Sequence, residues 1–478
     1  MTNKKLLAAI VSASAILTGC GSSSSSDSSS FLEKSVESTP RSIVGSPVDH
    51  CSEFGGDLID NDQVCALPGR ITASGGSLDA SLTYRLYGVT LLGYGDNKLE
   101  KSADLQWLLD NPVSLDIPAG TTIEGKAGSA LVVTRGAKLN AMGTAAAPII
   151  FESEDDNLNG SSEWGGIVVQ GFGISNKCPD TGICNVLGEG GVGYYGGDNN
   201  LDSSGTLNYV VVTEGGYEVS VDNELNGVSF MAVGSGTTVD YLQVNENSDD
   251  GVEFWGGAVV VKHLVLTANQ DDSIDWDNGW VGGIQYALVT QEAGKGDHLF
   301  ETDNDGNSMN STPRSMPTIA NVTAISSGKD TGIKHREGTG AMFYNVVVTE
   351  ASAARCVDID DQATSDQIDT GLVYTNVVLD CSTLSKTGSD CSLDKDGVNV
   401  CNGEDNKEFA EDLLASQVSK LLTGADIKGA LNGYAWTGED AITAPVIDNV
   451  KVNANTYFGA MEDANDKWFE GWTVNGSL

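Results

Sequence analysis

The chain has few of the residues from which many binding and catalytic sites are built. It contains 4 histidines and no C-x-x-C motif, so it lacks the ligand spacing of a zinc site. Lys and Arg number 26 against 67 Asp and Glu, which gives a net charge of −41. Because such a chain repels phosphates, we expect no nucleic-acid partner. The same charge attracts divalent cations.

Long apolar runs are also scarce, and the clearest one, from Leu6 to Leu17, is too short to span a bilayer. It follows a lysine pair and ends in Leu-Thr-Gly-Cys20, so residues 1–19 are predicted to be a secretory signal peptide. This ending resembles the lipobox of bacterial lipoproteins, which implies that Cys20 is lipidated and anchors the protein. A plain signal peptide is the alternative. By the same resemblance, Gly21 favours the cell outer membrane, at its periplasmic or extracellular face.

Eight further cysteines follow Cys20, and an even number suggests disulfides in an exported protein. Spacing alone leaves the connectivity open. The short separations favour Cys51 with Cys65, Cys178 with Cys184, and Cys391 with Cys401, which leaves Cys356 and Cys381.

Proline is rare at 10 residues while glycine reaches 58, a composition typical of short strands joined by turns. One Val- and Leu-rich motif recurs along the chain. Its copies begin at Asn208, Asp240, Lys262, Gln285, Asn321, Asn345 and Asn376. The closely spaced copies start 22, 23 and 24 residues apart (240 to 262, 262 to 285, 321 to 345), which is the period of a β-solenoid. The longer gaps are predicted to be loop insertions.

We therefore predict an all-β protein, a right-handed parallel β-helix whose rungs stack about 4.8 Å apart. A leucine-rich repeat would need its Leu and Asn consensus, and a β-sandwich would not keep a fixed period. Apolar residues three and four apart between Asn402 and Thr423 predict a helix that caps one end. The predicted domains are the signal peptide (1–19), the lipidated cysteine with a Ser-rich tether (20–48), an N-terminal cap (49–105), the β-helix (106–385) and a helical C-terminal capping region (386–478).

Three segments of the sequence also carry a family resemblance. They begin at Trp164-Gly-Gly-Ile-Val-Val, at Gly193-Tyr-Tyr-Gly-Gly-Asp and at Phe458-Gly-Ala-Met-Glu, the last followed by Trp468 and Trp472. They are similar to secreted outer-membrane lipoproteins of Gram-negative bacteria that have a pectin-lyase-like β-helix. Most members of that group are uncharacterised, so the resemblance implies the fold and the location rather than an activity.

Alternation along one strand of each rung predicts which side chains point outward. Two columns result, namely Glu253, Asp275, Glu301, Lys334, Asp358 and Trp255, Asp277, Asp303, Arg336, Asp360. Like charges one rung apart repel by roughly 1 kcal/mol in water and by about 3 to 4 kcal/mol at an effective dielectric of 20. The acids therefore need counter-charges. We expect Lys334 and Arg336 to supply some, and Ca²⁺ to bind Glu253, Asp275, Asp277, Glu301 and Asp303; side chains that extend separately into solvent are the alternative.

Two turns could add ligands to this face, Asp249-Asp250 and Asp271-Asp272. The second turn also bears on an alternative function, a polysaccharide lyase or hydrolase. By resemblance to pectin-lyase-like enzymes, Lys334, Arg336, Asp271 and Asp272 would be the catalytic residues, with Ca²⁺ beside them. Gln270-Asp271-Asp272 resembles one part of the polygalacturonase signature, but its Gly-His-Gly and Arg-Ile-Lys parts are absent.

Two tryptophans near these columns are predicted to point in opposite directions. Trp276 is expected to face inward with Phe254, while the outward Trp255 is the better ligand platform. The sequence therefore favours a non-enzymatic scaffold for adhesion or for assisting an outer-membrane transporter. The other class of partner expected for this scaffold is an extracellular polysaccharide. Its expected ligand-binding residues are Trp255, Lys334, Arg336, Asp358 and Asp360.

Overall fold

The structure is a computed structural model of the chain, and its described residues begin at His50. They are 50–60, 63–155, 160–218, 224–326, 331–350, 355–381, 383–385, 391–393, 399–401, 406–416, 419–421, 431–432, 434–436, 452–453 and 456–478. The expected signal peptide, Cys20 and the tether lie outside them. Of the helices in these ranges, none is both long enough and apolar enough to cross a bilayer.

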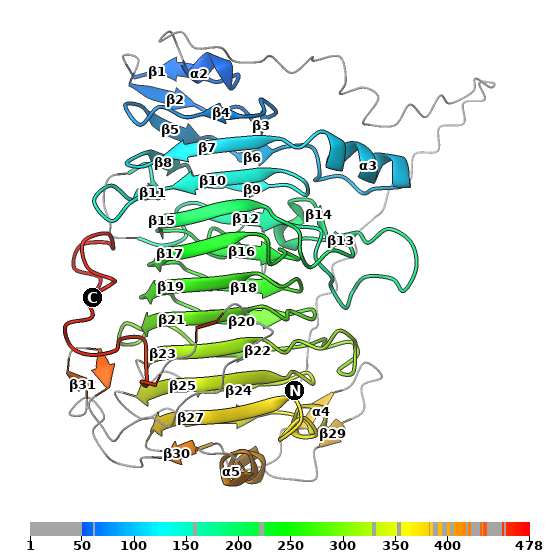
Figure 1. Cartoon of the computed structure of the whole chain (residues 1–478), viewed down its shortest axis with the longest axis vertical. Helices are drawn as coiled ribbons and strands as arrows, with labels where there is room; N and C mark the ends of the chain where they lie inside the picture. The colour runs from blue at the N-terminus through cyan, green and yellow to red at the C-terminus, as the bar shows by residue number, and fades with distance from the viewer. Residues whose placement is uncertain are drawn as a thin grey trace, which may run out of the picture. The chain divides into compact units, whose positions relative to one another are not determined.

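Two stacked parallel sheets form the body of the protein, as Figure 1 shows. The larger sheet has 16 strands: β1 (Asp57–Ile59), β2 (Val64–Ala66), β4 (Gly76–Ser77), β5 (Thr83–Leu86), β7 (Ser114–Pro118), β8 (Thr122–Gly125), β10 (Lys138–Met142), β11 (Ile149–Ser153), β15 (Gly205–Thr213), β17 (Thr238–Asn245), β19 (Val260–Thr267), β21 (Gly283–Thr290), β23 (Thr318–Ser326), β25 (Ala341–Glu350), β27 (Leu372–Asp380) and β30 (Ser419–Leu421).

The smaller sheet has 10 strands, which alternate along the chain with those of the larger sheet. They are β3 (Arg70–Ile71), β6 (Val89–Leu92), β9 (Ala130–Val133), β12 (Ile167–Gln170), β16 (Val228–Met231), β18 (Val252–Trp255), β20 (Ile274–Asp277), β22 (Phe300–Thr302), β24 (Thr331–His335) and β26 (Arg355–Ile359). Successive strands of each sheet pair in parallel from β2 onward. The predicted all-β, right-handed parallel β-helix class is confirmed by these stacked parallel sheets.

Helices and short antiparallel hairpins lie outside the two sheets. The helices are α2 (His50–Glu53), α3 (Ser102–Asp110), α4 (Gln362–Ser365), α5 (Asn406–Ser416) and the 3₁₀ turn η1 (Glu189–Gly191). The antiparallel hairpins are β13 (Val186–Leu187) with β14 (Tyr194–Tyr195), β28 (Cys391–Leu393) with β29 (Asn399–Cys401), and β31 (Leu431–Asn432) with β32 (Ala435–Trp436).

The recurring motif forms the long strands of the larger sheet, and each copy bends at one residue of left-handed conformation. The bend residues are Tyr209, Tyr241, His263, Tyr286, Asn321, Asn345 and Asn376. The predicted alignment was therefore wrong by one residue in its last three copies, where the asparagine occupies the bend position rather than the position before it. Asparagine tolerates this conformation well. The four aromatic bend residues stack with ring centroids 4.2, 4.3 and 4.9 Å apart, and stacking helps to offset the backbone strain.

Inward side chains of both sheets form one continuous apolar core. Trp276 is fully buried, as predicted, and Phe254 stacks between Phe230 and Trp280 at centroid distances of 5.1 and 3.9 Å. Burying one such side chain contributes about 2 to 3 kcal/mol. The repeated ladder of core residues is what holds the outward columns in a fixed register.

The two ends of the solenoid differ from the expected domains. Parallel pairing already begins at Val64, within the stretch 49–105 that we expected to be a cap. Helix α5 buries Phe409 and Leu413 against the last rung, but it ends at Ser416. The predicted helix to Thr423 was too long, because Ser419–Leu421 pairs with β27 as a further strand.

Three of the expected cysteine pairs are disulfides in the structure, Cys51–Cys65, Cys178–Cys184 and the remaining pair Cys356–Cys381. Backbone pairing places Cys391 opposite Cys401 in β28 and β29. The side chains of these two residues lie outside the part that the structure describes.

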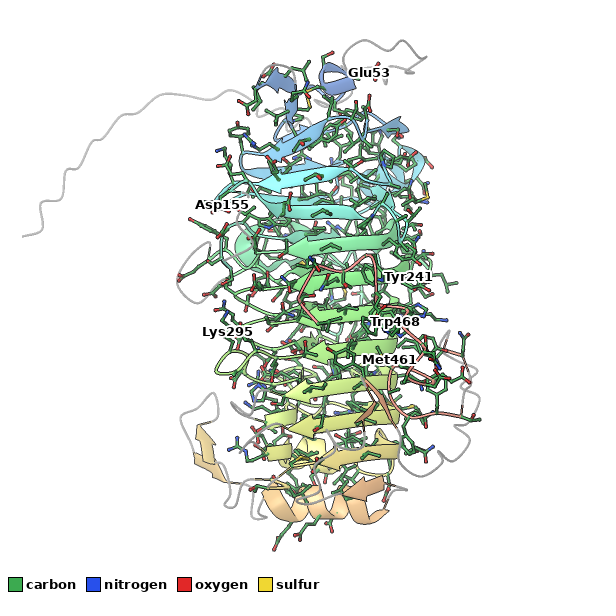
Figure 2. The ribbon with its side chains drawn as sticks, turned by 90° about the vertical axis from the view of Figure 1, so that its left-hand side faces the viewer. Glu53, Asp155, Tyr241, Lys295, Met461 and Trp468 are labelled. Atoms are coloured by element: carbon green, nitrogen blue, oxygen red, sulfur yellow. A yellow bond between two sulfur atoms is a disulfide. The ribbon has the colours of Figure 1, made fainter. Side chains whose placement is uncertain are left out.

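Residues 456–478, which we expected in the capping region, lie along the flank of the solenoid instead. The Gly459 amide donates to the Asn345 carbonyl, and the Val474 amide donates to the Gln243 side chain. Trp468 packs edge-on against Tyr241 at a centroid distance of 6.4 Å, and Figure 2 shows the two on the same flank.

Candidate functional site

The outer face of the smaller sheet carries the predicted column of charges. Cα pairing places Glu253 beside Asp275, Asp275 beside Glu301, Glu301 beside Lys334 and Lys334 beside Asp358, so the predicted register is correct. Ser229 precedes Glu253 in this strand column. The second column also follows the prediction at its first step, because Trp255 pairs with Asp277.

A second set of polar side chains lies in the turns that lead into these strands. Asn226, Asp250, Asp272 and His298 each stand two residues before a paired apolar residue of β16, β18, β20 or β22. Backbone bonds hold these turns in line: the amides of residues 227, 251 and 273 donate to the carbonyls of Asp250, Asp272 and His298 at 3.0, 2.9 and 3.0 Å. The turn column and the strand column therefore run side by side.

The outward face is covered rather than open to solvent. Glu253 is 8% exposed and Asp303 is 6% exposed. Tyr195 of the β13–β14 hairpin forms an apolar cluster with Leu225 and Met231, and Trp255 packs against that cluster. Trp255 does point outward, but it is not an open ligand platform. Figure 1 shows the hairpin beside the rungs of the smaller sheet.

Three carboxyl groups converge at the centre of this face. Asp250, Glu253 and Asp275, which we call the carboxylate cluster, have oxygen atoms that all lie within 4.8 Å of one another. Asn226 donates from Nδ2 to Glu253 Oε2 at 2.7 Å. The Oδ1 atoms of Asp275 and Asn226 are buried and have no hydrogen-bond partner in this part of the structure. Asp250 also belongs to a neighbouring acidic group with Asp249 and Asp271.

Burial and mutual repulsion perturb these acids. Burial, followed by the charge of Asp275, raises the pKa of Glu253 well above its usual range. Burial likewise raises the pKa of Asp250 and Asp275. Around them, burial and neighbouring carboxylates raise the pKa of Asp249 to about 7 and that of Glu189, from η1 above the sheet, to about 8. At neutral pH the face therefore has to take up protons or a cation.

The next rungs are neutralised by ion pairs. Arg336 Nε lies 2.8 Å from Asp303 Oδ1, Arg336 Nη2 lies 2.5 Å from Glu301 Oε2, and Lys334 Nζ lies 3.4 Å from Glu301 Oε1. Burial alone would lower the pKa of Arg336, but Asp303 and Glu301 raise it overall. Glu301 and Asp303, which we predicted as Ca²⁺ ligands, are thus placed with arginine instead of with the carboxylate cluster.

The remaining predicted site residues lie in separate surroundings. Asp277 accepts from the Asn278 amide, and burial raises its pKa to about 7. Asp358 is 1% exposed and accepts from Arg355 and Thr331. Asp360 is half-buried at the end of its strand.

The two acids proposed for catalysis, Asp271 and Asp272, also differ in their surroundings. Asp271 is exposed on its turn, whereas Asp272 is buried against His298, with its Oδ1 2.8 Å from Nδ1. Ion pairs join Lys334 to Glu301, and Arg336 to Glu301 and Asp303. Asp272, Lys334 and Arg336 therefore all lie near Glu301, whereas Asp271 is exposed.

Three polar residues of this face were missed from the sequence: Glu189, Asn226 and His298. His298 and Asn226 could have been found by extending the Asp250 and Asp272 turn position one rung in each direction, since the spacing to the following strand is the same. Glu189 had no such signal, because it comes from an insertion that folds back over the sheet.

The sequence matches the pectate-lyase-like β-helix domain family over residues 98–473. The chain therefore belongs to this family, in agreement with its stacked parallel sheets. No curated protein and no solved structure shows a significant match to it. Family membership fixes the architecture and leaves the activity to be argued from the site.

Proposed function

We propose that the protein is an exported, lipid-anchored β-helix scaffold whose carboxylate cluster binds Ca²⁺. The observation that carries this proposal is the convergence of Asp250, Glu253 and Asp275 within the span of a single cation, with a buried Asp275 oxygen that has no hydrogen-bond partner. Burial and then mutual repulsion raise the pKa of these carboxyls, and bound Ca²⁺ would offset the repulsion.

The chemistry of the ligand set suits this ion. Ca²⁺ takes about six to eight oxygen ligands at about 2.3 to 2.6 Å in a flexible geometry. Three carboxylates offer oxygens from two adjacent rungs, and Asn226 brings an amide that already contacts Glu253. The rungs fix the backbone of all four residues, so the site needs only side-chain adjustment to close around the ion.

The anchor and the partners are the second part of the proposal. The sequence ending in Cys20 supports lipidation, and Gly21 supports the outer membrane. A rigid solenoid on a Ser-rich tether suits a scaffold that binds a cell-envelope protein, such as an outer-membrane transporter, or an extracellular polysaccharide. Bound Ca²⁺ would also reduce the repulsion between this face and an anionic polymer.

A Ca²⁺-dependent polysaccharide lyase or hydrolase is the alternative function, and the site supports it less well. A catalytic base must lose its proton, yet Asp303 and Glu301 raise the pKa of Arg336. Lys334 is likewise placed beside Glu301. Incubation with anionic polysaccharides in Ca²⁺, followed by measurement of unsaturated products and reducing ends, distinguishes the two functions: the scaffold predicts neither product.

Calorimetric titration with Ca²⁺ tests the metal proposal. The purified full-length protein, freed of metal by chelation, is expected to bind Ca²⁺ saturably, and Glu253→Gln is expected to lose this binding. Asp412→Asn, an exposed acid on α5, is the matched control and should bind as the wild type does. Equal binding by Glu253→Gln and the wild type would overturn the assignment.

A further inference from the structure

A second group of ligands lies one rung beyond the carboxylate cluster and differs from it by containing an imidazole. Asp272, His298 and Glu301 have ligand atoms that all lie within 4.8 Å of one another. His298 Nδ1 faces three carboxylates, at 2.8 Å from Asp272 Oδ1, 3.7 Å from Glu301 Oε1 and 3.9 Å from Asp297 Oδ2. We propose that these four residues, the His298 group, bind a divalent transition metal of the zinc class.

The distances suit such an ion. Zinc binds nitrogen and carboxylate oxygen at about 2.0 to 2.2 Å, so ligand atoms in a tetrahedron lie roughly 3.3 Å apart. The separations from Nδ1 fall on both sides of this value. Shifts of about half an ångström or less would bring Asp272 Oδ1 and Glu301 Oε1 to this distance from Nδ1. Asp297 lies outside the group whose ligand atoms are all within 4.8 Å of one another, so its side chain must turn to complete the four.

The carboxylates of Asp272 and Glu301 are already oriented toward the His298 imidazole. The His298 backbone amide donates to Asp272 Oδ1 at 2.6 Å, which fixes that carboxylate beside the imidazole. Arg336 donates to Glu301 Oε2 and thereby turns Oε1 toward His298. Such surrounding hydrogen bonds hold metal ligands in place in characterised sites. Lys334, at 3.4 Å from Oε1, has a long partly exposed side chain that can leave when the metal enters.

The group is buried but reachable. The His298 side chain is 5% exposed and that of Asp272 is 7% exposed, whereas that of Asp297 is 35% exposed. Figure 2 labels Lys295, two residues before Asp297, at the edge of the solenoid. Asp297 is therefore the member of the group that an ion from solvent can reach most readily.

The imidazole selects the metal. Nitrogen ligands favour zinc and its neighbours over Ca²⁺, which prefers oxygen alone. The Asp272 and Asp275 rung is thus divided between two groups: Asp275 joins the carboxylate cluster and Asp272 joins the His298 group. Zinc binding does not require the proposed Ca²⁺ site to be correct, and the two can be tested separately.

The test is calorimetric titration of the metal-free full-length protein with Zn²⁺. We expect saturable binding that His298→Gln weakens by about 100-fold or more, since even loss of a surrounding residue costs ~10- to 100-fold. His263→Gln is the matched control, because His263 also pairs through Nδ1 with an aspartate, Asp240, at 2.7 Å. It should bind zinc as the wild type does.

Two further variants separate the possible results. Glu253→Gln should retain zinc while losing Ca²⁺; loss of zinc in that variant, with retention in His298→Gln, would place zinc at the carboxylate cluster and overturn the assignment. Absence of binding by the wild type would overturn it as well. If His298→Gln does not fold, the partly exposed Asp297→Asn serves in its place, and affinity equal to the wild type would count against the site.

Discussion

Replacing Asp275 with asparagine should have opposite effects in the absence and in the presence of Ca²⁺. Burial, followed by repulsion from Glu301, Asp303 and Asp272, raises the pKa of Asp275, so keeping this acid in the cation-free protein at pH 8 costs folding free energy. Two like charges one rung apart repel by about 3 kcal/mol at an effective dielectric of 20. Since Arg336 offsets part of this repulsion, we expect Asp275→Asn to stabilise the cation-free protein by about 1 to 3 kcal/mol.

The assay is thermal unfolding followed by near-ultraviolet circular dichroism, with chelator or with saturating Ca²⁺. An unfolding entropy of ~2.1 cal/mol/K per residue gives about 1 °C per kcal/mol for a chain of this size, so the variant's Tm should rise by about 1 to 3 °C in chelator. Ca²⁺ at about 100 times its Kd should stabilise the wild type by about 2.7 kcal/mol and the variant by much less. Asp412→Asn should change neither value. A variant that is less stable in chelator, with an unchanged response to Ca²⁺, would refute the reasoning.

Three other outcomes follow from the same contacts. Folding raises the pKa of Asp249 to about 7 and that of Glu189 to about 8, so the stability they provide is present below their ordinary pKa and is lost as pH rises. The Tm of the cation-free protein should therefore fall between about pH 5 and 8, and Ca²⁺ should reduce this fall. A Tm that rises over this range would be contrary evidence. Arg336→Gln should destabilise the protein by about 3 to 5 kcal/mol in urea unfolding, because it leaves Asp303 buried without its counter-charge; a loss under about 1 kcal/mol would contradict this. Cys20→Ser should move the protein from the membrane to the soluble fraction, and unchanged fractionation would exclude lipid anchoring.

Local patterns were enough to predict the strands and their outward columns. Side-chain alternation is a property of each strand, and the core residues repeat in every rung, so the column from Glu253 to Asp358 could be read correctly from the sequence. The bend position was harder, because a left-handed residue interrupts the alternation. The copies at Asn321, Asn345 and Asn376 were therefore misaligned by one residue.

The carboxylate cluster was predictable only in part. Glu253 and Asp275 share a column, and the Asp249-Asp250 turn was noted as a source of ligands. What sequence could not provide was the cover over the sheet. Glu189 and Tyr195 come from an insertion whose path depends on long-range packing, and this packing buries the face and raises the pKa of its acids.

Ion-pair partners within the columns were also beyond sequence reasoning. Arg336 was expected to neutralise some of the acids, but its choice of Asp303 and Glu301 depends on side-chain rotamers. That choice removes two predicted ligands from the proposed Ca²⁺ site. The proposed site is therefore confined to the rungs where no basic side chain was predicted in either column.

The most direct test of the calcium site is a crystal structure of the protein soaked in Ca²⁺, with diffraction data that record the anomalous signal of the ion. We predict an anomalous peak between Asp250, Glu253 and Asp275, with oxygen ligands at about 2.3 to 2.6 Å. An ordered cluster without a peak, in which the three carboxyl groups hydrogen-bond to one another as protonated acids, would contradict it.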